Sequence, residues 1–478
     1  MVLASFIFFL LLFLAVGLSS ARHARKSRED YYLASSQVPP SVVALSAVAT
    51  NNSGYMFIGV IGYTYAVGLA AVWLMVGWIL GDFLASLYVH GRLRHATERT
   101  REASFSAVMA RWSGGDMPIW RRLAAFMTIV FLGSYAAAQI AAGGKALQGT
   151  LGWEPETGAW MVAAMVLSYS IAGGIRASIW TDVAQSLVML VAMTVLFIAG
   201  IQALGGWSAT FEAWREIPGF FDLTPPDMLV PGIAGILMFA VGWLFAGLSV
   251  IGQPHIMVRF MALDSADSMV RARVWYYTFF TVFYALATGV GMLARLYLPD
   301  LANLDPELAL PTMADKVLPP VLVGVVLAGI FAATISTADS LVLSCSASLT
   351  HDIVPGRLEH PWILKGATAL VTSLALVIAL GGNQSVFDLV VLSWSTLGVA
   401  FGPLLIVYAL GRRVSEWGAI LMMFAGVAVA LYWRHVGLHE MIFEGLPGLV
   451  IGVLIGLFIS SPMTKRRRDD AEEALAEG

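Results

Sequence analysis

Long apolar segments recur along the whole chain, and they limit its possible folds more than any other feature. Thirteen of them reach or approach the length at which a helix crosses a hydrocarbon core about 30 Å thick. Of the 478 residues, 58% are hydrophobic and only 12% are charged, which is more apolar surface than a soluble core can bury. The sequence therefore predicts an all-α, polytopic membrane protein. The expected transmembrane segments lie at about 2–20, 41–65, 67–90, 120–147, 157–173, 182–204, 231–256, 273–297, 318–350, 362–381, 386–411, 416–433 and 442–461.

The basic residues indicate how these segments are oriented. An odd number of crossings places the two ends of the chain on opposite sides of the membrane. If the N-terminus lies outside, 23 of the 28 Lys and Arg residues fall in inside loops, as the positive-inside rule requires. Arg259 is assigned to one of these loops, and 465–478 becomes a short charged cytoplasmic tail. We therefore expect an N-out, C-in, multi-pass protein of the plasma membrane.

The ninth segment carries a row of polar residues in its middle. Helical spacing places Ser336, Asp339 and Ser340 on one face as i, i+3 and i+4 neighbours, with Thr337 beside them. Hydroxyl and carboxylate oxygens suit a hard cation such as sodium, and an ionisable residue inside a membrane is a functional candidate by default. The alternative is that the hydroxyls bond to the preceding turn of their own helix and that Asp339 lies in a water-filled cleft without a ligand.

Two segments are interrupted by residues that disfavour a helix. The second contains ATNNSG at 49–54, and the seventh contains GLSVIGQP at 247–254. Unwound backbone at membrane depth is tolerated where it is buried or lines a cavity, and a matched pair of breaks is typical of transporters with inverted repeats. Alternatively, the glycines serve close helix packing and the proline only kinks its helix.

The breaks lie five segments apart, which sets the expected domain organisation. We predict a leucine-transporter-like fold with a five-plus-five inverted repeat and 13 transmembrane helices. One transmembrane domain, 1–464, would contain a preliminary helix and first inside loop at 1–40, repeats at 41–204 and 231–411, and two extra helices at 416–461.

Four sequence strings carry a family resemblance. DYYLASSQVPP (30–40), SYSIAGGIRASIWTDVAQ (168–185), GQPHIMVRFMA (252–262) and AATISTADSLVLSCSA (332–347) resemble the sodium:solute symporter family. GQPHIMVRFMA in particular is similar to its sodium/proline symporter branch. The likeness extends from Asp30 to about Val407, and the four motifs occur in the family's order.

The resemblance implies a sodium site between the second and ninth segments. Its backbone carbonyl ligands would be Ala49 and Asn52 on the broken helix and Ala333 on the ninth segment, and its hydroxyl ligands Ser336 and Thr337. Sodium would then be the transported coupling ion, and no other cofactor is expected.

Some family members hold a further sodium nearer the inside. Its positions fall on Asp182, Asp339 and Ser340, where a carboxylate, Asp339, replaces a family hydroxyl. A second cation, or a proton on one of the two acids, is therefore left open. Another acid, Asp82, is expected at the end of its helix near an inside loop rather than facing a cavity.

The implied substrate pocket departs from the proline branch. Asn51 stands where that branch has an aspartate, and Ala246 and Val250 stand at its aromatic contacts, whereas Tyr135 matches. Trp243 and Tyr55 lie near enough to shape a replacement pocket, although aromatic residues at helical spacing are more often ordinary packing.

The break itself supplies further substrate candidates. The helix ends at Asn51, Ser53 and Gly54 would leave carbonyls free for a cation and N–H groups free for an anionic group such as a carboxylate. We expect sodium-coupled symport of a small solute into the cell, proline or a related amino acid or zwitterion. The alternatives are a carboxylate, a betaine- or choline-like compound or a sugar, with protons as an alternative coupling ion.

Two other classes of function are less well supported. A transporter-like sensor would need an output domain, and the chain extends only about fifteen residues past its last apolar segment. An enzyme would need a catalytic set, and the sequence shows no metal-ligand spacing and has a single cysteine, Cys345. The expected partners are the solute, sodium and membrane lipid, with no nucleic acid, and we expect a monomer to be functional.

Overall fold

A segment within a bilayer must pair its own backbone N–H and C=O groups, and an α-helix does so internally. The apolar segments accordingly lie on helices in the computed structural model, which describes residues 1–20, 27–225, 230, 232–299, 304–353, 361–381 and 385–463. The main helices are α1 (Val2–Ser20), α3 (Pro40–Gly54), α4 (Ile61–Val67), α5 (Val72–Tyr88), α8 (Pro118–Leu151), α9 (Pro155–Ala203), α11 (Gly232–Leu248), α13 (Met269–Tyr297), α15 (Pro320–Ala347), α16 (Pro361–Leu380), α17 (Val386–Ala409), α18 (Glu416–His435) and α19 (Gly445–Ile459). Within the described ranges, ten helical stretches are long and apolar enough to cross a membrane.

Shorter elements connect the main helices. Two of them begin with a serine cap: the side chain of Ser27 accepts the Asp30 N–H, and that of Ser104 accepts the Ala107 N–H. The short helices are α2 (Arg28–Leu33), α6 (His90–Thr100), α7 (Phe105–Arg111), α10 (Trp207–Arg215), α12 (Pro254–Met261) and α14 (Ala309–Val317). Strands β1 (Arg412–Arg413) and β2 (Ser461–Pro462) pair antiparallel, with Arg412 opposite Pro462, and join the ends of α17 and α19. The tail at 465–478 lies outside the described residues.

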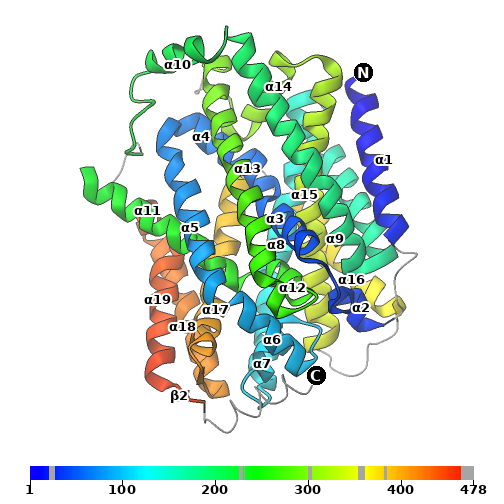
Figure 1. The fold of residues 1–478 in the computed structure, drawn as a ribbon, viewed down its shortest axis with the longest axis vertical. Coiled ribbons are helices and arrows are strands. Elements are labelled where there is room, and N and C mark those ends of the chain that lie inside the picture. Colours follow the sequence, from blue (N-terminus) through cyan, green and yellow to red (C-terminus); the bar gives the residue numbers. More distant parts are fainter. Residues whose placement is uncertain are drawn as a thin grey trace.

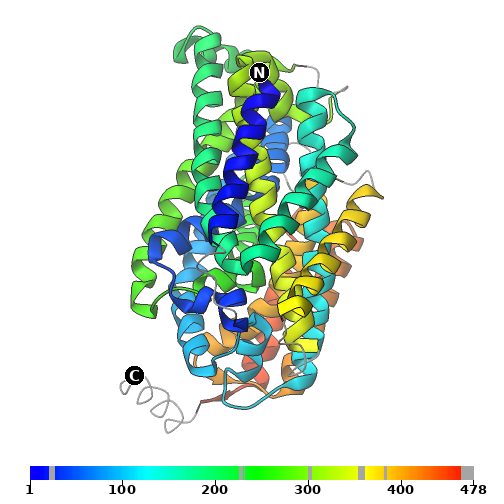
Figure 2. The ribbon, with the colours of Figure 1, turned by 90° about the vertical axis from the view of Figure 1, so that its right-hand side faces the viewer.

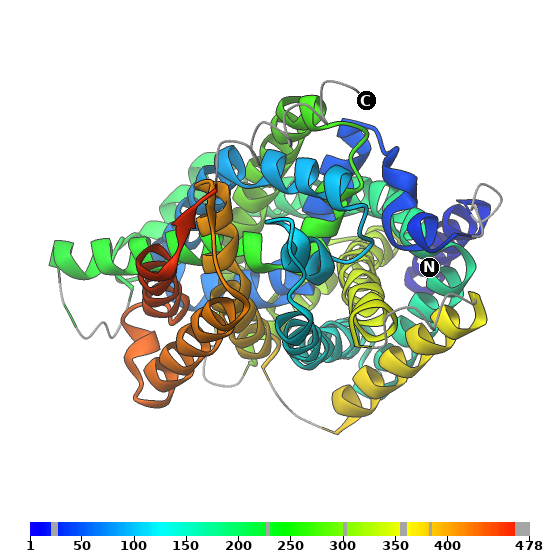
Figure 3. The same ribbon diagram turned by 90° about the horizontal axis from the view of Figure 1, so that it is seen from below.

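The helices form an elongated bundle, and α1 begins at the opposite end from β2 (Figure 1). Helix α15 is buried over most of its length and packs against α8 and α9, and α1 lies along α9 and α15 (Figure 2). Viewed along the bundle, α18 and α19 lie on one side, and α1 and α16 on the other (Figure 3). The polar row of the ninth segment is therefore in the interior of the protein.

One long helix contains a sharp kink. The segments expected at 157–173 and 182–204 are both part of α9, which changes direction at Gly174 (φ 56°, ψ −144°). A β-carbon at Gly174 would lie 2.5 Å from the Tyr31 carbonyl oxygen. Only glycine fits both the positive φ and this close approach.

Both predicted helix breaks are confirmed. In α3, Ser53 has φ 43° and ψ 177°, and a π-helical run, Tyr55–Val60, follows it. After α11, a 3₁₀ turn, Ser249–Gly252, leads to the extended residue Gln253, and α12 then begins at Pro254. A positive φ at a non-glycine residue stores strain, which the surrounding contacts must offset.

Candidate functional site

The hydroxyls of α15 face the break in α3. Ser336 and Thr337 are fully buried. The hydroxyl of Ser336 donates to the carbonyls of Ala49 (3.3 Å) and Ala333 (3.1 Å), and that of Thr337 donates to the carbonyl of Thr50 (2.9 Å). These hydroxyls therefore point to the last turn before the break and not to lipid.

Three of the expected sodium ligands meet in this arrangement, namely the carbonyls of Ala49 and Ala333 and the hydroxyl of Ser336. The carbonyl of Asn52 accepts the N–H of Tyr55 across the break. The side-chain amide of Asn52 is buried, and neither of its polar atoms has a partner among the described residues. Carbonyl and hydroxyl oxygens are the ligands a hard cation prefers, so the arrangement is chemically suited to sodium.

The N–H groups after the break, which were expected to be free, have acceptors within the protein. The Gly54 N–H donates to Gln139 Oε1 at 2.7 Å, and the Tyr55 N–H donates to Ser53 Oγ at 3.1 Å. Tyr135, one turn before Gln139, donates its hydroxyl to Ser53 Oγ at 3.2 Å. Gln139 was not predicted as a site residue, although a glutamine in an apolar helix is a signal that could have identified it.

We expect the Gln139→Met substitution to destabilise the protein by about 1 to 3 kcal/mol, because the buried Gly54 N–H loses its acceptor. The loss would be measured as a lower melting temperature of the purified protein. Gln185→Met is the matched control, since both polar atoms of the buried Gln185 side chain lack partners in the described part of the chain. Equal melting temperatures for the two variants would contradict the role assigned to Gln139.

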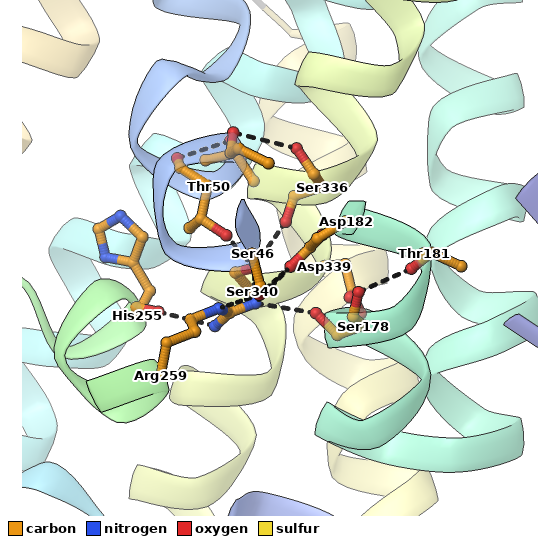
Figure 4. Close-up of polar contacts among 12 residues, drawn as sticks. Ser46, Thr50, Ser178, Thr181, Asp182, His255, Arg259, Ser336, Asp339 and Ser340 are labelled. Atoms are coloured by element: carbon orange, nitrogen blue, oxygen red, sulfur yellow. Dashed lines mark hydrogen bonds and ion pairs between the residues drawn. The ribbon is translucent and has the colours of Figure 1, made fainter. Parts of the chain in front are cut away.

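A second polar layer surrounds the guanidinium of Arg259 (Figure 4). Arg259 is fully buried on α12, and its Nη2 donates to Ser178 Oγ (2.8 Å), to Asp182 Oδ2 (3.3 Å) and to Ser340 Oγ. Ser46 of α3 completes the layer: it donates to Asp182 Oδ2 at 2.6 Å and accepts from Arg259 Nε at 3.3 Å. One side chain thus links α12 to α3, α9 and α15.

This layer corrects one expectation and refines another. Arg259 was assigned to an inside loop, but it lies in the protein interior. A count of basic residues cannot distinguish a loop arginine from one that follows an unwound turn and pairs with a buried acid. The expected second set is divided, because Asp182 and Ser340 contact Arg259 whereas Asp339 accepts a hydrogen bond from Ser170 of α9. The other oxygen of Asp339 has no partner among the described residues.

Asn51 contacts an acid from another helix. Its Nδ2 donates to the hydroxyl oxygen of Tyr276 at 2.6 Å and to Asp82 Oδ2 at 3.3 Å. Tyr276 and Tyr277 of α13 donate to the Asp82 carboxylate at 2.8 and 2.7 Å. The expectation that Asp82 lies at a helix end near a loop is therefore wrong: Asp82 is fully buried in α5, and the α13 phenols donate hydrogen bonds to its carboxyl group.

Aromatic rings gather beside the break. Tyr55 lies 5.5 Å from Trp78 and 5.2 Å from Phe387 between ring centroids. Trp78 also contacts Trp243 at 5.9 Å and Trp394 at 4.9 Å. We call these five residues the aromatic cluster. Of its members, Tyr55 and Trp243 were predicted from the sequence, whereas Trp78, Phe387 and Trp394, which come from α5 and α17, were not.

Ala246 contacts this cluster, and Val250 follows it one turn later in the chain. The indole N–H of Trp394 donates to the Ala246 carbonyl at 2.7 Å, and Val250 is fully buried in the 3₁₀ turn after α11. Tyr135 places its ring edge-on to His255, with the centroids 5.6 Å apart. The substrate candidates therefore surround the two breaks, although Asn51 faces Asp82 and not the aromatic rings.

A cavity of about 380 Å³ lies beyond Phe387. Tyr63, Lys145 and Glu307 line it, and the ammonium group of Lys145 pairs with the carboxylates of Glu307 and Asp305. Phe387 belongs to both the cavity lining and the aromatic cluster. The stacked rings of Tyr55 and Phe387 thus lie between the cavity and the break in α3.

Comparison with known sequences identifies the family. The sequence pattern of the sodium:solute symporter family matches residues 31–426. The high-affinity proline transporter PutP of Bacillus subtilis is 30% identical over 443 residues, which cover 90% of this chain and 92% of that protein. The sodium/proline symporter of Escherichia coli is also 30% identical, over 93% of this chain and 91% of its own.

Comparison with solved structures identifies the same fold. The chain matches a Na⁺-coupled sialic acid symporter in a substrate-bound outward-open state, with a TM-score of 0.82 and 19% identity, over 97% of this chain and 99% of the other. A nucleobase-cation-symport-1 family transporter matches with a TM-score of 0.58 and 14% identity, over 93% and 98% of the two chains. The fold, the four motifs and the family pattern agree. The chain therefore belongs to the sodium:solute symporter family: it is a multi-pass transporter of the plasma membrane that uses sodium as its coupling ion.

Proposed function

We propose that this symporter carries proline, or a related amino acid or zwitterion, into the cell together with sodium. The observation that carries the proposal is the contact of Ser336 and Thr337 with the carbonyls of Ala49 and Thr50 next to an unwound turn. Curated relatives at 30% identity are named as proline transporters. Both halves of the proposal, the ion and the solute, therefore have independent support.

The sodium site would use the carbonyls of Ala49, Asn52 and Ala333 and the hydroxyls of Ser336 and Thr337. In the structure these hydroxyls bond directly to α3 carbonyls. An ion between them would replace those hydrogen bonds with coordination by several oxygens. Asn52 would turn its carbonyl from the Tyr55 N–H toward the ion.

The substrate would bind at the break in α3, beside the aromatic cluster. The candidate contacts come from α3, α8, α11 and the turns that follow α3 and α11, and they are Asn51, Ser53, Gly54, Tyr55, Tyr135, Trp243, Ala246 and Val250. The aromatic faces suit an ammonium group through cation–π attraction. A carboxylate at the break would have to replace Gln139 Oε1 and Ser53 Oγ as acceptors of the Gly54 and Tyr55 N–H groups. This combination favours a zwitterion over a sugar or a simple carboxylate. Betaine-like compounds are the next candidates.

Coupling would follow because sodium and substrate stabilise the same arrangement of α3 and α15. A tenfold sodium gradient contributes about 1.4 kcal/mol, and a potential of 100 mV contributes about 2.3 kcal/mol more. One sodium ion could thus support accumulation of a neutral substrate by a factor of several hundred. That is sufficient for uptake of a nutrient or an osmolyte.

We further propose 13 transmembrane helices, with the N-terminus outside and the C-terminus inside, in a leucine-transporter-like five-plus-five inverted repeat. The positions of α1 and β2 at opposite ends of the bundle support an odd number of crossings. The matched breaks at Ser53 and Gln253 support repeats at 41–204 and 231–411. The single domain 1–464 and the cytoplasmic tail 465–478 complete this proposal, in which a monomer is the functional unit.

Uptake of labelled solutes into proteoliposomes tests the function. We expect proline uptake that requires an inward sodium gradient and that an unlabelled excess of proline abolishes. A panel of other amino acids, betaines, carboxylates and sugars, tested as competitors, would define the substrate. Competition by another class but not by proline would refute the proline assignment, and uptake driven by a proton gradient without sodium would refute the coupling ion.

A further inference from the structure

Asn51 lies on the last turn of α3 before the break, and only one end of its side-chain amide is hydrogen-bonded. Its Nδ2 donates to the hydroxyl oxygen of Tyr276 at 2.6 Å and to Asp82 Oδ2 at 3.3 Å. Its Oδ1 is buried, and within the described ranges it has no hydrogen-bond partner. A buried acceptor without a donor is costly, so a ligand that brings a donor to Asn51 would gain affinity from it.

The direction of this amide follows from the hydroxyl of Tyr276. A phenol has a single hydrogen to donate, and Tyr276 donates it to Asp82 Oδ2 at 2.8 Å. Toward Asn51 the same oxygen can only accept, so the end of the amide that faces Tyr276 must be Nδ2. Asp82 thus determines, through Tyr276, that Asn51 leaves an acceptor and not a donor unpaired.

Asp82 is also connected to the proposed substrate site through its own helix. It lies one turn after Trp78 on α5, and residues four apart share one face of a helix. Trp78 belongs to the aromatic cluster, and its ring lies 5.5 Å from that of Tyr55, which follows the break. Asp82 is fully buried, and in the described part of the chain it forms no ion pair. A positively charged guest at the break would therefore gain from a carboxyl group that no other cation neutralises.

We propose that Asp82 is a positioning residue for the substrate: through Tyr276 it holds Asn51 so that the amide oxygen accepts a hydrogen bond from the substrate's ammonium group. The substrate class that follows is a zwitterion whose nitrogen carries at least one hydrogen, as in proline and other amino acids. A fully methylated ammonium group has no N–H and would lack this contact. The inference rests on the proposed function, and it disfavours betaines, which the aromatic rings alone would accept.

Two neighbouring phenols of α13 provide a matched pair of variants. Tyr276→Phe removes a donor to Asp82 together with the contact to Asn51, whereas Tyr277→Phe removes a donor to the other carboxyl oxygen and leaves the Asn51 contact in place. Asp82→Asn introduces an amide that can itself donate to Tyr276, so the Asn51 amide can reverse. The exchange variant, Asn51→Asp with Asp82→Asn, places an oxygen at both ends of side chain 51 and makes its direction irrelevant.

The experiment measures ligand binding to the purified full-length protein in saturating sodium, so the variants need not transport. Three compounds of similar size would be compared: L-proline, tetrahydrofuran-2-carboxylate, in which an ether oxygen replaces the ammonium group, and N,N-dimethylproline, whose nitrogen has no hydrogen. The dissociation constant of each would be determined. Sodium binding without substrate would be followed separately by the sodium-dependent rise in melting temperature.

We expect the unmodified protein and Tyr277→Phe to bind proline about tenfold or more tightly than either analogue, as for a hydrogen bond to a charged group. Asp82→Asn and Tyr276→Phe should each lose about tenfold in proline affinity, with little change for the two analogues. The exchange variant should regain the preference for proline. Sodium binding without substrate should stay the same throughout.

Three results would overturn the proposal: equal affinities for proline and dimethylproline in the unmodified protein, equal losses in the two phenylalanine variants, or no recovery in the exchange variant. Weaker sodium binding at an unchanged preference for proline would also overturn it, because Asn51 would then act on the ion. If Asp82→Asn does not fold, the comparison of the two phenylalanine variants decides alone. An unmodified protein that binds another solute and none of the three compounds would instead refute the proposed function.

Discussion

Replacing Ser336 or Thr337 by alanine is expected to raise the sodium concentration needed for half-maximal uptake by about tenfold or more. This change corresponds to the roughly 1 to 3 kcal/mol that is lost with a buried polar contact. Each substitution removes an oxygen that faces the unwound turn and leaves a carbonyl of α3 without its partner. Uptake at saturating sodium should fall less, because the substrate contacts are retained.

Ser344→Ala is the matched control for this pair. Ser344 lies two turns further along α15 and donates to the Ser340 carbonyl of its own helix at 2.9 Å. Its removal should leave the sodium requirement unchanged. The sodium-dependent rise in melting temperature of the purified variants would provide a second readout. The assignment fails if Ser336→Ala and Ser344→Ala show the same sodium dependence.

Gly81→Ala is expected to destabilise the protein by about 3 kcal/mol, the upper part of the range for overpacking. A β-carbon at Gly81 would lie 1.9 Å from the Leu244 carbonyl oxygen and 2.8 Å from the Leu248 nitrogen. Opposite it, a β-carbon at Gly247 would lie 2.1 Å from the Trp78 carbonyl oxygen. Because these obstacles are backbone atoms, α5 and α11 would have to separate.

The yield of monodisperse protein and its melting temperature measure this effect. Gly133→Ala is the control, since a β-carbon there would meet no atom within 4 Å and alanine favours the helix over glycine by up to about 1 kcal/mol. A folded Gly81→Ala protein that melts no lower than Gly133→Ala would show that the two helices are not in close contact.

Local features of the sequence predicted most of the helices and both breaks. The length of an apolar run and the weak helix formers near Ser53 and Gln253 are properties of a single segment. The local sequence is therefore enough to predict the helices and their breaks. The same holds for the face shared by Ser336 and Ser340, which follows from helical spacing alone. That these residues bind sodium stays a prediction.

Contacts between distant helices could not be read from the sequence. Whether Arg259 meets solvent or Asp182 depends on the direction in which α12 leaves the break, and no local pattern encodes that direction. Asp82 likewise becomes an interior residue only because two tyrosines of α13 pack against it. Gln139 pairs with Gly54 across 85 positions of sequence, which residue spacing within either helix does not indicate.

The backbone contact between α5 and α11 has a mechanical consequence. Where Gly81 and Gly247 meet, no side chain separates the two backbones, so we expect these helices to move as one body. On the other side of Gln253, α12 is held to α9 through a guanidinium whose hydrogen bonds can break and re-form. We therefore expect the turn at Gln253 to act as the hinge between α11 and α12 when the transporter changes from one open side to the other.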